Sequence, residues 1–213
     1  MNKGYKILTA VIVLVLAAIV YFIYSSGKDF NSLSDSSQSA VKIENLSSMM
    51  LTLEDFPPEQ AWRIRKITSG EIPPTANDDS FLSSGWKRGY QTTYEHGQTE
   101  YKSKDDLYST VSLVVLEYDV KNISRIIQPI LPICSVKNSR GNNSCKPIGI
   151  SGVGDEAKAY EITLVPATSG PSVTLYIIQF RKKNLGATLF MVGPLKDYDL
   201  LLNLSKKVSD KIE

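Results

Sequence analysis

The stretch GISGVGDEAKAYEI, residues 149–162, contains the clearest chemical motif of the chain. Gly152, Gly154 and Ala157 match the G-x-G-x-x-A spacing of a dinucleotide-binding turn, in which glycines let the backbone approach a pyrophosphate. That chemistry requires a helix after the glycines, because the phosphate binds at the helix N-terminus. Here apolar and polar residues alternate over 160–164, which is typical of a half-buried strand. We therefore expect the glycines to shape a strand entry and expect no nucleotide cofactor.

Few other side chains could carry acid–base or metal chemistry. His96 is the only histidine of the chain, and its place beside a glycine predicts a solvated turn residue. Two pairs of adjacent carboxylates, Asp78-Asp79 and Asp105-Asp106, are interpreted as solvated loops, with weak cation binding as the alternative. One histidine and two cysteines are too few ligands for a zinc site. The sequence thus predicts no catalytic centre, no metal and no cofactor.

Two groups of residues form a candidate binding surface. Trp86 and Tyr90, in GWKRGY, are aromatic residues beside glycine and basic residues. Such rings stack on sugars or anchor a protein partner, and packing at the end of a sheet is the alternative. Arg181, Lys182 and Lys183, in FRKKN, are expected at a hairpin tip. There they would either solubilise the turn or bind an acidic surface of a partner.

The two cysteines, Cys134 and Cys145, flank the polar loop SVKNSRGNNS. In an oxidising compartment this arrangement indicates a disulfide that closes a small loop and stabilises the fold by roughly 3 kcal/mol. Two free thiols are the alternative, and they would suit a cytosolic protein better.

Four N-x-S sequons indicate a glycosylated outer surface. Their asparagines are Asn45, Asn122, Asn142 and Asn203.

Residues 7–24, ILTAVIVLVLAAIVYFIY, form an uncharged apolar run that predicts a transmembrane helix. A helix of this length spans about 27 Å, close to the ~30 Å hydrocarbon thickness of a bilayer. Lys3 and Lys6 lie before the run, so the positive-inside rule places residues 1–6 in the cytoplasm and the rest of the chain outside. A signal peptide cleaved near residues 25–27 is one alternative, and pilin-type processing after Gly4 is a weaker one.

Charge excludes one class of partner. The chain has 24 Lys and Arg against 22 Asp and Glu, and the part after Lys6 carries 22 of each. A neutral outer region lacks the positive field that draws nucleic acid, so we expect no nucleic-acid partner.

The elements that would position these residues belong to one domain, 49–213, after a Ser- and Asn-rich stalk at 25–48. A short helix is expected at 122–131. A terminal helix is indicated by the apolar stripe of Leu201, Leu204, Val208 and Ile212. Strands are expected at 51–53, 85–97, 107–120, 160–164, 173–181 and 187–192. This order predicts an α+β domain, an antiparallel β-sheet packed with flanking helices, preceded by one N-terminal transmembrane helix.

The succession LTLEDFP, GVGDEAKAY, FRKKN and LLNLSKKVSDKI resembles the PsbP-like superfamily, which includes small membrane-tethered or lipoprotein domains of the DcrB kind. The resemblance covers residues 49–213 and implies an antiparallel sheet with flanking helices that serves as a non-enzymatic accessory or binding module. It carries over no catalytic residues. The chain differs from the lipoprotein members because it has no lipidated cysteine and has a cysteine-flanked loop at 134–145.

Together these features predict a single-pass protein of the cell membrane whose C-terminal domain lies outside and is not an enzyme. The domain would bind or support another membrane or envelope protein. An extracytoplasmic hydrolase or carbohydrate-active enzyme that uses loop carboxylates is the alternative function.

Overall fold

The structure is a computed structural model that describes residues 45–65, 69–72, 86–96, 109–119, 137–138, 141–165, 172–193 and 197–212. The predicted membrane span at 7–24, the helix expected at 122–131 and the two aspartate pairs lie outside these residues. Within the described ranges, which begin at Asn45, no helix has the length and apolar character needed to cross a membrane.

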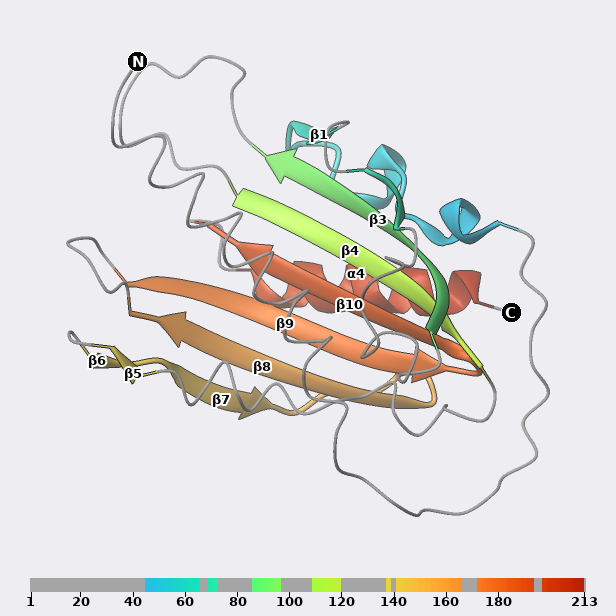
Figure 1. Ribbon diagram of the computed structural model, residues 1–213. Coiled ribbons are helices and arrows are strands. Elements are labelled where there is room, and N and C mark those ends of the chain that lie inside the picture. Colours follow the sequence, from blue (N-terminus) through green and yellow to red (C-terminus); the bar gives the residue numbers. More distant parts are fainter. Residues whose placement is uncertain are drawn as a thin grey trace.

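An eight-stranded sheet forms the body of the domain, with the strand order β1-β3-β4-β10-β9-β8-β7 and β2 paired to β3 (Figure 1). Every pairing between these strands is antiparallel. The strands are β1 (Trp62–Ile64), β2 (Gly70–Ile72), β3 (Trp86–His96), β4 (Ser109–Tyr118), β7 (Ser144–Ile148), β8 (Glu156–Leu164), β9 (Val173–Lys182) and β10 (Leu185–Val192). A separate small hairpin consists of β5 (Lys137–Asn138) and β6 (Gly141–Asn142).

The predicted hairpin between β9 and β10 is confirmed. Lys182 pairs with Leu185, so the turn has two residues, Lys183 and Asn184. Lys183 has a φ of 56°, the only positive φ of a described non-glycine residue. A positive φ at the first turn residue is typical of the turns whose twist matches that of antiparallel strands.

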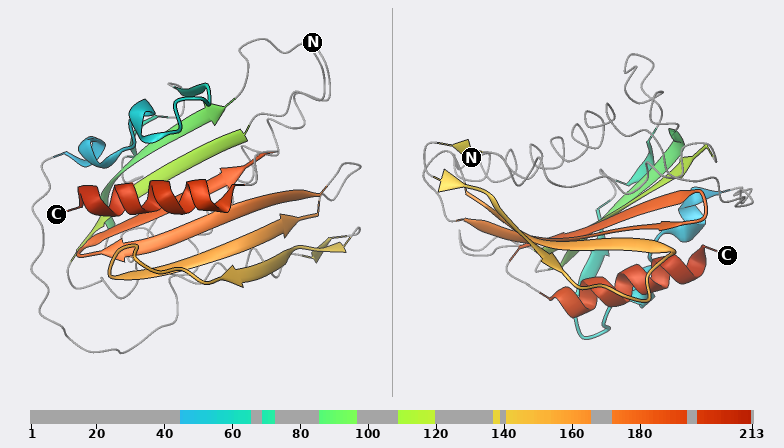
Figure 2. Two further views of the ribbon diagram at one scale, coloured as in Figure 1. Left: turned by 180° about the vertical axis from the view of Figure 1, so that it is seen from behind. Right: turned by 90° about the horizontal axis from the view of Figure 1, so that it is seen from below.

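One α-helix, α4 (Tyr198–Lys211), crosses one face of the sheet (Figure 2). Asp197 caps its N-terminus, because the carboxylate accepts a hydrogen bond of 2.8 Å from the backbone N–H of Leu200. The predicted apolar stripe is confirmed as the buried face of the helix. All four of its members, Leu201, Leu204, Val208 and Ile212, are fully buried in the main hydrophobic core.

The sheet is apolar on its second face as well. Neighbouring residues of a strand point to opposite faces, so Ile177 faces away from Ile178, which belongs to the core beneath α4. Ile177 joins a second cluster with residues that pair across β8, β9 and β10. This cluster consists of Ile162, Leu175, Ile177 and Phe190, each at most 5% exposed. Burial of both faces explains why the central strands carry so many β-branched residues.

The N-terminal segment differs from the prediction. The expected strand at 51–53 is wrong, since residues Leu53–Asp55 form a short 3₁₀ helix, η2. Thr52 and Asp55 form a capping box that favours helical over extended backbone. The ordered domain also begins before Met49, because a first 3₁₀ helix, η1 (Leu46–Met49), buries Leu46 to 4% exposure.

Candidate binding surface

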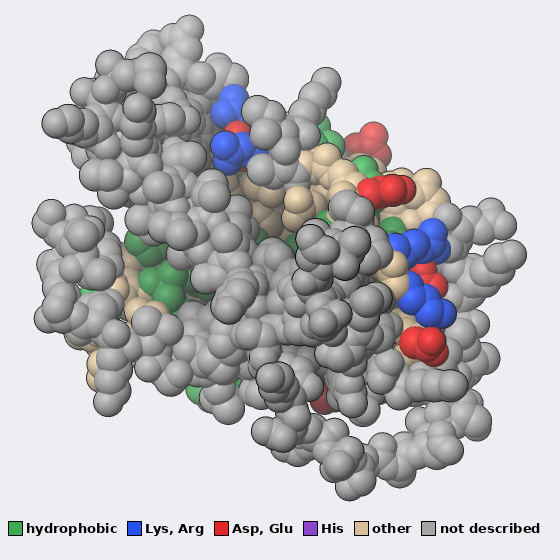
Figure 3. Space-filling model, in the orientation of Figure 1, with side chains coloured by type: hydrophobic (Ala, Val, Ile, Leu, Met, Phe, Trp, Pro, Cys, Tyr) green, Lys and Arg blue, Asp and Glu red, His purple; other side chains and the backbone are tan. Residues whose placement is uncertain are grey.

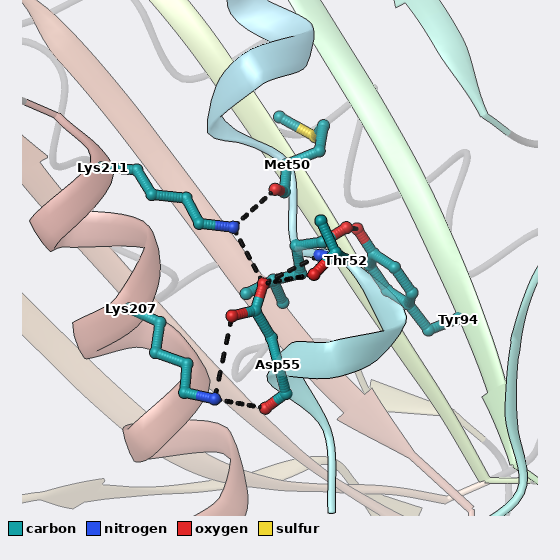
Figure 4. A network of polar contacts seen from close by, with 7 residues as sticks. Met50, Thr52, Asp55, Tyr94, Lys207 and Lys211 are labelled. Carbon is teal, nitrogen blue, oxygen red and sulfur yellow. Dashed lines mark hydrogen bonds and ion pairs between the residues drawn. The ribbon is translucent and has the colours of Figure 1, made fainter. Parts of the chain in front are cut away.

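Asp55 lies at the centre of a polar network that joins the N-terminal segment to α4 (Figure 4). Its carboxylate accepts hydrogen bonds from the backbone N–H of Thr52 at 2.8 Å and from Nζ of Lys211 at 2.8 Å. Nζ of Lys207 lies 3.7 Å from the same carboxylate and donates to the backbone carbonyl of Asp55 at 2.6 Å. Lys211 donates a second bond, of 2.9 Å, to the carbonyl of Met50. We call this arrangement the Asp55 clasp.

The electrostatics of the clasp favour the charged carboxylate. Burial raises the pKa of Asp55, but the hydrogen bond from Lys211, the N–H of Thr52 and the positive charges of Lys211 and Lys207 outweigh burial. The pKa therefore lies below the usual aspartate value of 3.8. Because the carboxylate is ionised and fully occupied, Asp55 serves to hold the fold together.

Tyr94 fixes the same segment from the sheet side. Its hydroxyl, on a fully buried side chain of β3, donates a hydrogen bond of 2.7 Å to the carbonyl of Leu51. Burial raises the pKa of Tyr94 well above its usual range, so the hydroxyl keeps its proton at all physiological pH values. The ring packs 4.8 Å from that of Phe56, which in turn lies 4.7 Å from Trp62. These aromatic contacts bury the segment against the α4 face of the sheet.

The basic residues expected at the hairpin tip are held by contacts within the domain. Arg181 lies 3.7 Å from Asp155 and 3.8 Å from Glu156. Lys182 donates a hydrogen bond of 2.8 Å to the carbonyl of Ser209 in the last turn of α4. The backbone N–H of Lys183 donates to Asp155 at 2.7 Å, which leaves the Lys183 side chain for solvent or a partner.

The glycine motif lies beside this hairpin. Gly152 and Gly154 have φ values of 71° and 61°, a region that favours glycine. A Cβ on Gly154 would lie 2.4 Å from the carbonyl oxygen of Arg181, and its N–H donates to Oγ of Ser209 at 3.0 Å. The motif leads directly into β8, as predicted. The glycines thus serve close packing against the β9–β10 hairpin.

The two aromatic residues of the predicted surface have different standings. Tyr90 is half-buried and packs against the main core on the α4 face, which favours the packing alternative for this ring. The backbone of Trp86 begins β3 opposite Tyr118, next to an irregularity in the β3–β4 register. The side chain of Trp86 lies outside the described residues.

His96 does not lie in a turn. It is the last residue of β3, pairs with Trp62 and Ser109, and is half-buried. Its ring lies 5.2 Å from that of Trp62. The glycine that follows it suggested a turn one residue too early, because the edge strand β1 extends the pairing to this position.

Charged pairs occur at both ends of the sheet. Glu95, near the end of β3, accepts from Arg63 and Arg65 at 3.2 Å each. Arg88, near the start of β3, lies 2.6 Å from Glu117. Figure 3 shows acidic and basic side chains next to one another at two ends of the face that lies opposite α4. In the part of the chain that the structure describes, no group of three or more His, Cys, Asp or Glu is placed to hold a metal ion.

Cys145 is disulfide-bonded, and its side chain packs against the second hydrophobic cluster. Cys134 lies outside the described residues, so the pairing of Cys134 with Cys145 stays a prediction. Three of the predicted glycosylation sites, Asn45, Asn142 and Asn203, are exposed, and Asn122 lies outside the described residues. Asn45 uses Oδ1 to accept from the N–H of Ser47 at 2.9 Å, which leaves its amide nitrogen for a sugar.

Sequence reasoning missed the Asp55 clasp. Two local signals could have indicated it: the T-x-x-D spacing of Thr52 and Asp55, and the spacing of four between Lys207 and Lys211 on one helix face. Neither signal shows that the two segments meet, because more than 150 residues separate Asp55 from each lysine.

A search against models of known protein families finds no match, and a search of curated protein sequences finds none either. Among solved structures, the chain is similar to the extracellular domain of PknH from Mycobacterium tuberculosis, with a TM-score of 0.51. The match has 11% sequence identity and covers 82% of this chain and 98% of that chain. At this identity the likeness concerns the fold, an antiparallel sheet with few helices.

Proposed function

We propose that the chain is a single-pass membrane protein whose extracytoplasmic domain binds or supports another component of the cell envelope. The observation that carries this proposal is the similarity of the fold to an extracellular domain over nearly all of that domain's length. A disulfide at Cys145 fits an oxidising compartment, and three exposed sequon asparagines fit a glycosylated surface. The uncharged run at 7–24 would supply the anchor.

Membership of the PsbP-like superfamily belongs to the same proposal. An antiparallel sheet with a C-terminal helix across one face agrees with the arrangement that the resemblance implies. The role that it implies, a non-enzymatic accessory module, agrees with the use of Asp55, Arg181 and Lys182 as structural contacts. Recognition would then depend on side chains outside these contacts, and Trp86 is our first choice.

Affinity purification tests this function. A C-terminally tagged chain is extracted from its own membranes in mild detergent, and the proteins that remain bound are identified by mass spectrometry. We expect one envelope protein to be enriched over an untagged control. Trp86→Ala should reduce its recovery by about thirtyfold, the usual effect of losing a central aromatic contact.

Leu53→Ala is a matched control, because Leu53 is an apolar side chain that is 46% exposed on another element, η2. Its recovery of the partner should equal that of the unchanged chain. Two results would contradict the proposal: no enriched envelope protein in repeated purifications, or turnover of a substrate by the purified domain. Equal recovery with Trp86→Ala would remove that ring as the contact.

A further inference from the structure

Lysines gather at the end of the domain where the described chain begins. Lys206, Lys207 and Lys211 lie in the C-terminal half of α4, and Lys182 and Lys183 lie at the β9–β10 turn. We call these five residues the lysine cluster. In Figure 1 the β9–β10 turn, the C-terminal end of α4 and η1 lie at the same end of the sheet.

Direct contacts join these segments. Lys182 bonds to the carbonyl of Ser209 on α4 at 2.8 Å, and Lys211 bonds to the carbonyl of Met50 after η1 at 2.9 Å. A Cβ on Gly152 would lie 3.9 Å from Cε of Lys206, so Lys206 stands over the turn before β8. The cluster is therefore one continuous surface, built from three parts of the chain that are far apart in sequence.

The acidic residues of this end leave an excess of positive charge. Asp55 pairs with Lys207 and Lys211, while Asp155 and Glu156 pair with Arg181. Among the described carboxylates, none forms an ion pair with the ammonium groups of Lys183 and Lys206. Even with Asp210 on the same helix counted, five lysines and Arg181 outnumber the four carboxylates by two. The chain after Lys6 is neutral, so this excess is local.

The predicted stalk keeps this end near the bilayer. Asn45 follows the last residue of the predicted span, Tyr24, by 21 positions. A flexible segment of that length has a root-mean-square span of about 25 Å. An anionic lipid surface attracts lysines that come within about one Debye length, some 8–10 Å, and each lysine strengthens the attachment about fivefold. The tether thus brings the cluster to distances where this attraction acts.

We propose that the lysine cluster binds the anionic lipid headgroups of the membrane that holds the anchor. The domain then rests on the bilayer through the C-terminal end of α4 and the β9–β10 turn. This inference rests on the proposed membrane anchoring and adds an orientation to it. The other end of the sheet, which carries Arg63, Arg65 and Glu95, faces away from the membrane and towards partners.

Lysine footprinting on the full chain tests the orientation. The protein is inserted into nanodiscs of phosphatidylcholine alone or with phosphatidylglycerol added, and acylation of each lysine is followed by mass spectrometry. We expect the acylation rates of Lys183 and Lys206 to fall about fivefold in the anionic discs and to recover at high salt. Lys146, exposed on the edge strand β7, is the internal control and should react equally in both discs.

A double variant, Lys183→Gln with Lys206→Gln, separates lipid binding from a general effect of the discs. Hydrogen exchange at the β9–β10 turn should be slower in anionic discs for the unchanged chain and the same in both discs for the double variant. Lys146→Gln should behave as the unchanged chain.

The outcomes distinguish this inference from the proposed function. A chain that inserts into discs but shows equal acylation of Lys183 and Lys206 in both lipids contradicts the inference and leaves the anchor intact. A chain that stays outside the discs contradicts the anchor and the inference together. Protection that appears only after an envelope extract is added, whatever the lipid, assigns the cluster to an acidic protein and overturns the inference.

Discussion

Single residues in this domain are constrained by contacts that their local sequence does not reveal. Gly154 shows this most clearly. Its motif suggests a phosphate-binding turn, but the backbone of Arg181 fills the space where a side chain would begin. Gly149, five residues earlier, has no atom within 4 Å of an added Cβ. Two glycines of one stretch therefore differ completely in what they tolerate.

Gly154→Ala should lower the free energy of unfolding by about 3 kcal/mol, because the Cβ would overlap the Arg181 carbonyl and the φ of 61° is unfavourable for alanine. Gly149→Ala should change it by less than about 0.5 kcal/mol. Urea unfolding followed by circular dichroism measures both values. A nucleotide-binding role would instead predict a Gly154 variant of unchanged stability.

Gln179 offers the opposite case, a residue whose replacement should stabilise. It is 8% exposed, and within the described structure its Oε1 is buried and accepts no hydrogen bond. Its amide nitrogen lies 3.5 Å from Oγ1 of Thr188, which is at the limit for a hydrogen bond. Gln179→Met has a similar volume and should raise the free energy of unfolding by about 1 kcal/mol. A thermal melt checks this, and a lower melting temperature would mean that the amide has a role of its own.

At the level of elements, the helix α4 and the N-terminal segment depend on each other through the Asp55 clasp. The folded-state pKa of Asp55 is lowered, so its contribution to stability is complete above the unfolded pKa and is lost as the pH falls through the folded value. The relevant window therefore lies below the usual value of 3.8.

Asp55→Asn keeps an acceptor for the N–H of Thr52 but removes the charge that Lys207 and Lys211 face. We expect it to lower the free energy of unfolding by about 1–2 kcal/mol at neutral pH. The difference from the unchanged chain should shrink below about pH 4. Denaturant unfolding across pH measures this. Glu54→Gln, on the same short helix, is the control and should show no such pH dependence.

The elements with a regular pattern could be predicted from the sequence, and those defined by distant contacts could not. The alternation over β8, the β-branched run of β4 and the stripe of α4 each report burial directly, so these elements are confirmed. At Leu51–Leu53 the same apolar spacing gave a wrong strand, because two lysines of α4 stabilise a 3₁₀ turn there. Likewise, the partners of Lys182 and Lys183 lie 27 and 28 residues away and leave no local trace.

The whole molecule is described by two predictions that the sequence makes and the fold accommodates. The first concerns the disulfide. Cys145 is bonded, and we expect Cys134 to be its partner. Mass spectrometry of peptides from protein isolated without reductant should show one linked pair. Reduction should lower the free energy of unfolding by roughly 3 kcal/mol. Two alkylated thiols in unreduced protein would contradict the pairing.

The second prediction concerns orientation across the membrane. With Lys3 and Lys6 on the inner side, protease added to intact cells should remove a C-terminal tag and spare a tag placed before residue 7. Sequencing of the mature N-terminus should give the uncleaved chain. The reverse pattern of protection, or a mature N-terminus near Lys28, would contradict an uncleaved anchor with the domain outside.

The Asp55 clasp also sets the order in which the domain can be completed during synthesis. Met50 and Asp55 leave the ribosome early, but their partner Lys211 follows them by 161 and 156 residues. The segment next to the membrane therefore waits in an unfinished state until the last turn of α4 has been made and delivered. Since such long-range contacts form slowly, the exposed residues Leu46, Met49 and Phe56 are the part of the nascent chain that a chaperone has most reason to cover.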